Sequence, residues 1–93
     1  MNTLLQTPSN LYTYIKNNQI ITDLKAQIAE NEKSLELLDR SIKRYEENNF
    51  TGVVEVFSGT YNKLNQKTIL LKIKLNELEK QNLLFELAAL SRE

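Results

Sequence analysis

The stretch that decides the fold is Asn48-Asn49-Phe50-Thr51-Gly52, near the middle of a chain of 93 residues. Asparagine and glycine tolerate left-handed backbone conformations, and Thr51 is a residue type that caps a helix beginning after it. The segment is therefore the strongest break in the chain. It predicts a turn at about residues 48–51.

The sequence before this break predicts one long helix. Thr7 and Pro8 suit an N-cap and a first helical position, because proline lacks the N–H that would have no partner there. From Tyr14 onward, seam positions recur at alternating steps of three and four, which is the heptad pattern of a helix packed against another helix. We expect this helix to span about residues 8–47. Its seam positions are Tyr14, Asn17, Ile21, Leu24, Ile28, Asn31, Leu35, Leu38, Ile42 and Tyr45.

The sequence after the break has two interpretations. Residues 53–57 have high β-propensity, and Ser58 and Gly59 suit the end of a short strand before a helix that begins at Thr60. The three-four alternation, however, continues through this stretch, and Gly59 weakens a helix by only up to ~1 kcal/mol relative to alanine. We prefer a single helix over about residues 52–91. Its seam positions are Val54, Phe57, Tyr61, Leu64, Thr68, Leu71, Leu75, Leu78, Asn82, Phe85 and Ala89.

The two seams match when the chain folds back at the turn. Positions whose numbers add to 99 then lie level, which sets Asn17 opposite Asn82 and Asn31 opposite Thr68. Buried polar groups cost free energy unless they are paired, so these four residues are expected to set the register. Two flanking ion pairs are also expected, Lys25 with Glu79 and Glu32 with Lys72. The predicted fold is all-α: a long, antiparallel, coiled-coil-like hairpin forming a single domain over residues 1–93, with residues 1–7 as a flexible or packing N-terminal segment.

The second predicted helix carries more apolar residues than its seam uses. A helix that is apolar on nearly every side is buried on both sides, and an open patch of this kind marks an interaction site. We expect a protein partner there, either a second copy in a homodimeric four-helix bundle or another helical protein. The alternative is that Leu4 and Leu5 fold over the patch within one chain. The predicted partner-binding residues, three of them at the start of the first helix, are Leu11, Tyr12, Ile15, Ile69, Leu70, Ile73, Leu83, Leu84, Leu87 and Leu90.

Composition argues against catalysis. The chain has neither His nor Cys, so thiolate chemistry, the commonest zinc ligands and the Glu-x-x-His motif of di-metal bundles are excluded. With only two glycines, it has no phosphate-binding loop. We expect a non-enzymatic interaction or assembly module with no catalytic residue, no cofactor and no metal.

A nucleic-acid-binding regulator is the rival interpretation. Lys63, Lys67 and Lys74 lie close along one side of the second predicted helix, within reach of a phosphate backbone. The 12 basic residues are balanced by 12 acidic ones, which removes a general attraction to nucleic acid and favours self-association. The solvated-face interpretation of these lysines is therefore preferred.

No apolar run approaches the ~20 residues of a membrane helix, and residues 1–8 lack the basic start and apolar stretch of a signal peptide. We expect no membrane span. The expected location is the cytoplasm, or outside the cell after export without a cleaved leader.

The tripeptide Phe50-Thr51-Gly52 before a long helix resembles the Trp-x-Gly hairpin of the WXG100 family of small helical proteins. The chain length and the mid-chain turn are also similar. The resemblance implies pairing of two hairpins into a four-helix bundle and export through type VII secretion, or a role as a helical partner of such substrates. Phe50 stands in place of the tryptophan, and no Tyr-x-x-x-Asp/Glu motif follows the second helix.

Overall fold

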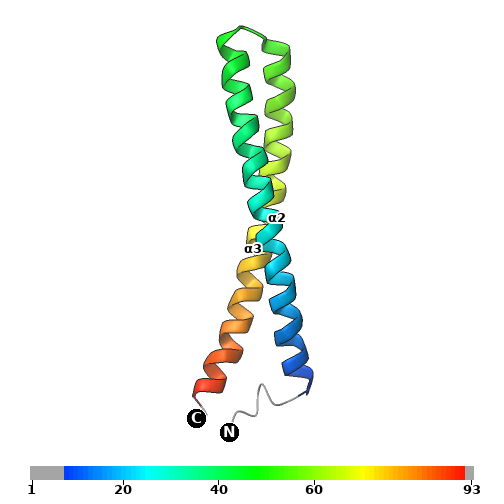
Figure 1. Cartoon of the computed structure of the whole chain (residues 1–93), viewed down its shortest axis with the longest axis vertical. Coiled ribbons are helices and arrows are strands. Elements are labelled where there is room, and N and C mark those ends of the chain that lie inside the picture. The colour runs from blue at the N-terminus through cyan, green and yellow to red at the C-terminus, as the bar shows by residue number, and fades with distance from the viewer. Residues whose placement is uncertain (1–7, 92–93) are drawn as a thin grey trace. The chain divides into compact units, whose positions relative to one another are not determined.

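The computed structural model describes residues 8–91 and consists of two long helices packed as a hairpin (Figure 1). Helix α2 spans Pro8–Glu47 and helix α3 spans Thr51–Leu90. The described residues contain no strand, so the helical interpretation of residues 53–57 is confirmed. The observed ends lie within one residue of the predicted ones. Thr7, the predicted N-cap, lies outside the described residues.

The turn ends α2 with a Schellman motif. Asn49 has a φ of 61°, a left-handed conformation that asparagine tolerates better than most residues. The N–H of Phe50 donates to the Tyr45 carbonyl at 3.0 Å, and the N–H of Asn49 donates to the Glu46 carbonyl at 3.1 Å. The rings of Tyr45 and Phe50 meet edge to face, with centroids 6.0 Å apart. The aromatic residue before Thr51 therefore stabilises the end of the first helix.

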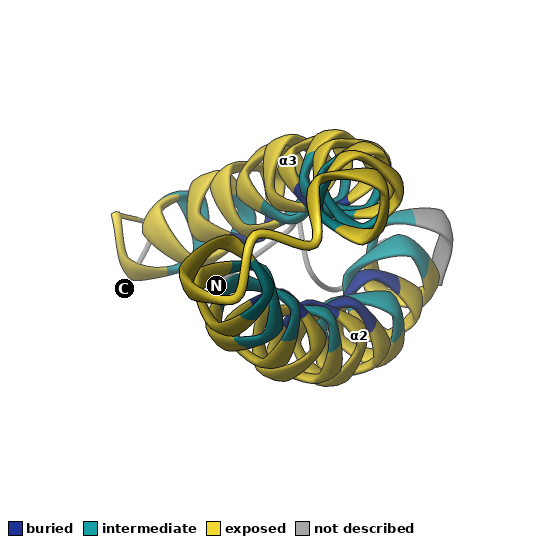
Figure 2. Cartoon of the chain, turned by 90° about the horizontal axis from the view of Figure 1, so that it is seen from above, coloured by how far each residue is buried: buried dark blue, intermediate teal, exposed yellow. Residues whose placement is uncertain are grey.

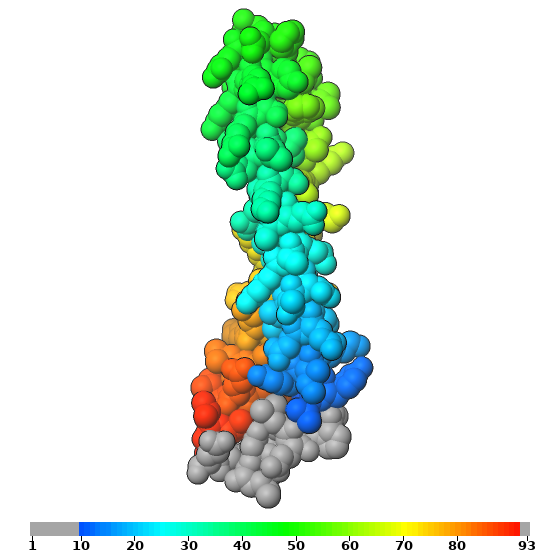
Figure 3. All heavy atoms as spheres, in the orientation of Figure 1, coloured from blue at the N-terminus to red at the C-terminus, as the bar shows by residue number. Residues whose placement is uncertain are grey.

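Helix α3 begins directly at the turn. The Phe50 carbonyl accepts the N–H of Val54 at 3.1 Å, which places Phe50 at the N-cap position and makes Thr51 the first helical residue. The ring of Phe57, one turn after Val54, contacts the ring of Tyr45, and the two ring centroids are 5.5 Å apart. In Figure 3 the atoms of the two helix ends that meet at the turn, drawn green, lie against each other. Aromatic packing thus accompanies the backbone hydrogen bonds of the turn.

Packing divides the hairpin into two compact units. Unit 1 is Met1–Lys25 with Ile73–Glu93, and unit 2 is Ala26–Lys72. Seen from above in Figure 2, the buried and half-buried residues of each helix lie on the side that faces the other helix. Each unit therefore has its own stretch of seam.

In unit 2 the seam buries Ile28, Leu35 and Thr68, which are 7%, 8% and 1% exposed. At the edge of this seam the Lys72 ammonium lies 3.2 Å from the Glu32 carboxylate. This is one of the two expected ion pairs. Both side chains are about half exposed, so the pair contributes no more than ~1 kcal/mol.

In unit 1 the seam buries Leu24 together with Asn17 and Asn82. The rings of Tyr14 and Phe85 meet edge to face at 6.4 Å between centroids. Both the aromatic pair and the asparagine pair join positions whose numbers add to 99, so the predicted register is confirmed here. The second expected ion pair is also present, with the Lys25 ammonium 3.7 Å from the Glu79 carboxylate.

Candidate protein-binding surface

The two seam asparagines of unit 1 are hydrogen-bonded across the seam between α2 and α3. The side-chain amide of Asn17 donates to the side-chain oxygen of Asn82 at 3.0 Å and to that of Gln81 at 2.8 Å. The Asn82 amide donates to the side-chain oxygen of Asn18 at 2.9 Å and to the Tyr14 carbonyl at 3.3 Å. Every one of these bonds joins α2 to α3. A rotation or slip of either helix in unit 1 would break them, and a buried polar group without a partner costs ~1–3 kcal/mol.

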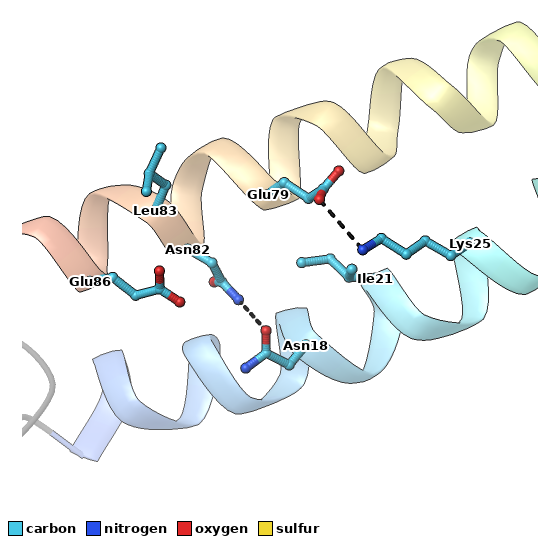
Figure 4. Close-up of a pocket in the computed structure, with 7 residues that line it drawn as sticks. All are labelled: Asn18, Ile21, Lys25, Glu79, Asn82, Leu83 and Glu86. Atoms are coloured by element: carbon cyan, nitrogen blue, oxygen red, sulfur yellow. Dashed lines mark hydrogen bonds and ion pairs between the residues drawn. The ribbon is translucent and has the colours of Figure 1, made fainter.

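Figure 4 shows the consequence for the neighbouring residues of α3. Asn82 and Asn18 point toward one another, whereas Leu83 points away from α2. The polar contacts therefore turn the next residue of α3 outward. In this way the seam of unit 1 decides which side chains the outer face presents.

A second polar contact in unit 1 joins the Tyr14 hydroxyl to the Glu86 carboxylate at 2.6 Å. The hydrogen bond to Glu86 raises the pKa of the Tyr14 phenol above its ordinary value near 10, because it favours the protonated form. Partial burial and the negative charge of Glu86 raise it further, while a hydrogen bond with Asn18 acts in the opposite direction.

Sequence reasoning missed three members of this network: Asn18, Gln81 and Glu86. Each is next to, or four residues from, a predicted seam asparagine, and each lies beside the seam rather than on it. The signal in the sequence was the clustering of amide residues at 17–18 and 81–82. The three-four pattern of the seam does not include these residues.

Thr68 and Asn31, the other predicted register-setting residues, lie in unit 2. Thr68 is 1% exposed, and its hydroxyl donates to the Leu64 carbonyl of the same helix at 2.7 Å. Asn31 is half-buried. Their role in the register stays a prediction, since the bond made by Thr68 does not cross between the helices.

The outer side of α3 in unit 1 is strongly apolar. Leu84 is 61% exposed and Leu87 is 50% exposed, while Asn82 on the opposite side of the same helix is 4% exposed. On α2, Tyr12 is 65% exposed, and the Lys16 ammonium lies 5.7 Å from the centre of its ring. The remaining predicted partner-binding residues of this unit are also exposed, namely Leu11, Ile15, Ile73, Leu83 and Leu90.

Unit 2 also exposes apolar side chains. Ile69 and Leu70, the two predicted partner-binding residues of this unit, are exposed on α3. Four further exposed residues were not part of the predicted surface: Leu37, Phe50, Val53 and Val56. Leu37 is exposed on α2, and Val53 and Val56 are exposed one turn apart on α3. Leu37 and Val56 supply matched controls for substitutions in unit 1.

A groove of about 370 Å³ lies between the two helices of unit 1. Its polar lining includes Lys25, Glu79, Asn82 and Glu86. Lys25 and Glu79 are paired with each other, Glu86 accepts the Tyr14 hydroxyl, and Asn82 is bonded to Asn18. The polar groups of the groove are thus engaged in holding the two helices together.

The three lysines of the rival interpretation do not lie within one unit. Lys63 and Lys67 are exposed one turn apart on α3 in unit 2, whereas Lys74 belongs to unit 1. Over residues 8–91, acidic side chains form no cluster of three or more that is suited to a metal ion. Neither α2 nor α3 is apolar enough over its length to cross a membrane.

No family model, no curated protein and no solved structure matches this chain.

Proposed function

We propose that this chain is a non-enzymatic protein–protein interaction or assembly module. It binds a helical protein through the outer apolar face of α3 and the N-terminal part of α2. The observation that carries the proposal is the exposure of Leu84 and Leu87, at 61% and 50%, on a helix whose inner seam is already occupied by α2. Burying such side chains in an interface is favourable by roughly 25 cal/mol per Å² of apolar surface.

The chemistry of the chain supports the same role. It has no His or Cys to act as a base or a nucleophile at neutral pH. Its zero net charge weakens repulsion between copies and between the chain and most protein partners. We place this activity in the cytoplasm, or outside the cell after export. For the exported alternative, the resemblance of Phe50-Thr51-Gly52 to the Trp-x-Gly turn favours a substrate of type VII secretion or a helical partner of such a substrate.

The test is the double variant Leu84→Glu, Leu87→Glu, compared with wild type by light scattering, circular dichroism and tandem purification from the native cells. Both residues lie outside the seam, so helicity should persist. The self-assembly or the purified complex should be lost, because an unpaired charge in an interface costs several kcal/mol.

The matched control is Leu37→Glu, Val56→Glu. It makes the same chemical change at side chains that are 61% and 65% exposed in unit 2, and it should leave every assembly intact. Two results contradict the proposal. One is a fall in melting temperature with unchanged mass and unchanged partners, which means that the patch is covered within a single chain. The other is retention of full stability and full assembly.

The nucleic-acid rival has its own readout. Replacing Lys63, Lys67 and Lys74 with glutamate should have no effect on assembly under our proposal. DNA or RNA binding that weakens steeply with salt and disappears in this variant would favour the rival instead.

A further inference from the structure

The outer face of α3 carries a second seam, distinct from the one that contacts α2. Within unit 1, starting at Ile73, residues on this face recur at steps of four, three and four. All four are exposed on a helix that is continuous over this range. The members of this outer seam, in order, are Ile73, Glu77, Lys80 and Leu84.

The outer seam is symmetric about its centre. Its middle is an oppositely charged pair, Glu77 and Lys80, and one apolar residue flanks that pair on each side. When a second α3 is laid antiparallel with the two-fold axis between these charges, Glu77 of each copy meets Lys80 of the other. Ile73 then meets Leu84.

Other registers of the same helix match less well. A parallel arrangement sets Glu77 against Glu77 and Lys80 against Lys80. An antiparallel arrangement shifted by one heptad, in either direction, sets a charged residue of the seam against an apolar one. Centring the axis on Glu77 or on Lys80 sets like charges opposite each other, which is destabilising. Only the register centred between the two charges pairs unlike charges and apolar residues throughout.

We infer that the partner of this chain is a second copy of itself, bound antiparallel through the outer seam of α3 with a two-fold axis between Glu77 and Lys80. An interface of this kind is isologous, because the same patch serves both subunits. The inference rests on the proposed function and adds the identity and orientation of the partner. The zero net charge of the chain is compatible with self-association.

Single-cysteine cross-linking tests the orientation, since the chain has no cysteine of its own. The variants Ile73→Cys and Leu84→Cys are oxidised separately and as an equal mixture. We expect disulfide dimers in the mixture, at least tenfold more than in either variant alone. Leu37→Cys, exposed on α2 in unit 2, is the control and should not cross-link with either variant. Cross-linking of each variant with itself, with no gain on mixing, would mean a parallel dimer and would overturn the inference.

Charge substitution tests the same register and does not depend on two cysteines meeting in a geometry that allows a disulfide. Glu77→Lys and Lys80→Glu should each raise the dimer dissociation constant roughly tenfold, since each places like charges opposite twice per dimer. An equimolar mixture of the two should recover wild-type affinity, because every central contact is again between unlike charges. No recovery on mixing would also overturn the inference. If Leu84→Glu, Leu87→Glu still abolishes an assembly in that case, the proposed function stands and only the partner or its orientation is wrong.

Discussion

The seams of the two units follow the same three-four pattern, but the buried polar residues in them are hydrogen-bonded differently. In unit 2 the Thr68 hydroxyl is satisfied by the Leu64 carbonyl of its own helix, so the bond survives any placement of α2. In unit 1 Asn82 is satisfied only by groups on α2, and Asn17 is satisfied by groups on α3. A cross-helix bond carries information about register that an intrahelical bond lacks. The polar bonds of the unit 1 seam therefore depend on the register of its two helices, and the bond made by Thr68 does not.

The largest expected effect comes from the apolar packing on which both units depend. In unit 2, Leu35→Ala should lower the free energy of unfolding by ~2–4 kcal/mol, because Leu35 is 8% exposed and its removal leaves a cavity. Leu24→Ala, at 5% exposure, should do the same in unit 1. Urea denaturation measures both. The control Leu37→Ala, at 61% exposure, should cost under ~0.5 kcal/mol, and equal losses at Leu35 and Leu37 would contradict the seam.

The next largest effect is expected to differ between unit 1 and unit 2. Asn82→Leu should cost ~1–3 kcal/mol, because it removes the hydrogen bonds that Asn82 makes with Asn17, Asn18 and the Tyr14 carbonyl at a buried position of the seam. Thr68→Val is the matched control in unit 2, and it should change stability by under ~0.5 kcal/mol because no group on α2 loses a bond.

The double variant Asn17→Leu, Asn82→Leu sharpens this contrast. It should recover part of the stability lost in Asn82→Leu, since both members of the pair are then apolar. A thermodynamic cycle from urea denaturation gives the coupling energy. Equal losses for Asn82→Leu and Thr68→Val would refute the difference between the units.

A smaller effect of opposite sign concerns the start of α3 in unit 2. Gly59 has ordinary helical backbone, and a Cβ added there would meet no atom within 4 Å. Gly59→Ala should therefore stabilise the protein by ~0.5–1 kcal/mol, by reducing the entropy of the unfolded chain. Thermal denaturation checks this. A lower melting temperature would indicate that residues 53–59 are not helical in solution.

The smallest effect is the pH dependence that Tyr14 contributes to unit 1. The folded state raises the pKa of this phenol, mainly through the bond to Glu86, so it favours the neutral form. The resulting stabilisation is complete below pH 10 and is lost as the pH rises through the folded-state pKa. Melting temperatures above pH 10 should fall more steeply for wild type than for Tyr14→Phe. Identical curves would mean that the bond to Glu86 is not made in solution.

The sequence predicted the helices and their register because the seam repeats without interruption. Asn17 and Asn82 could be paired from their numbers alone, once the turn was placed at Asn49. The contacts of Asn18, Gln81 and Glu86 were not predicted, since a side chain beside the seam has several rotamers and several acceptors within reach. The outward direction of the predicted binding leucines follows from helical periodicity. Their partner does not, because it depends on the surface chemistry of a second molecule.

The pairing of two copies through α3 is tested most directly by sedimentation equilibrium, which measures the mass of the protein in solution at concentrations up to millimolar. The account predicts a mass approaching twice the 10.8 kDa of one chain, and a return to one chain in Leu84→Glu, Leu87→Glu with helicity unchanged. A mass of one chain at every concentration for the wild-type protein would contradict the antiparallel pairing of α3. The outer seam would then need a different explanation.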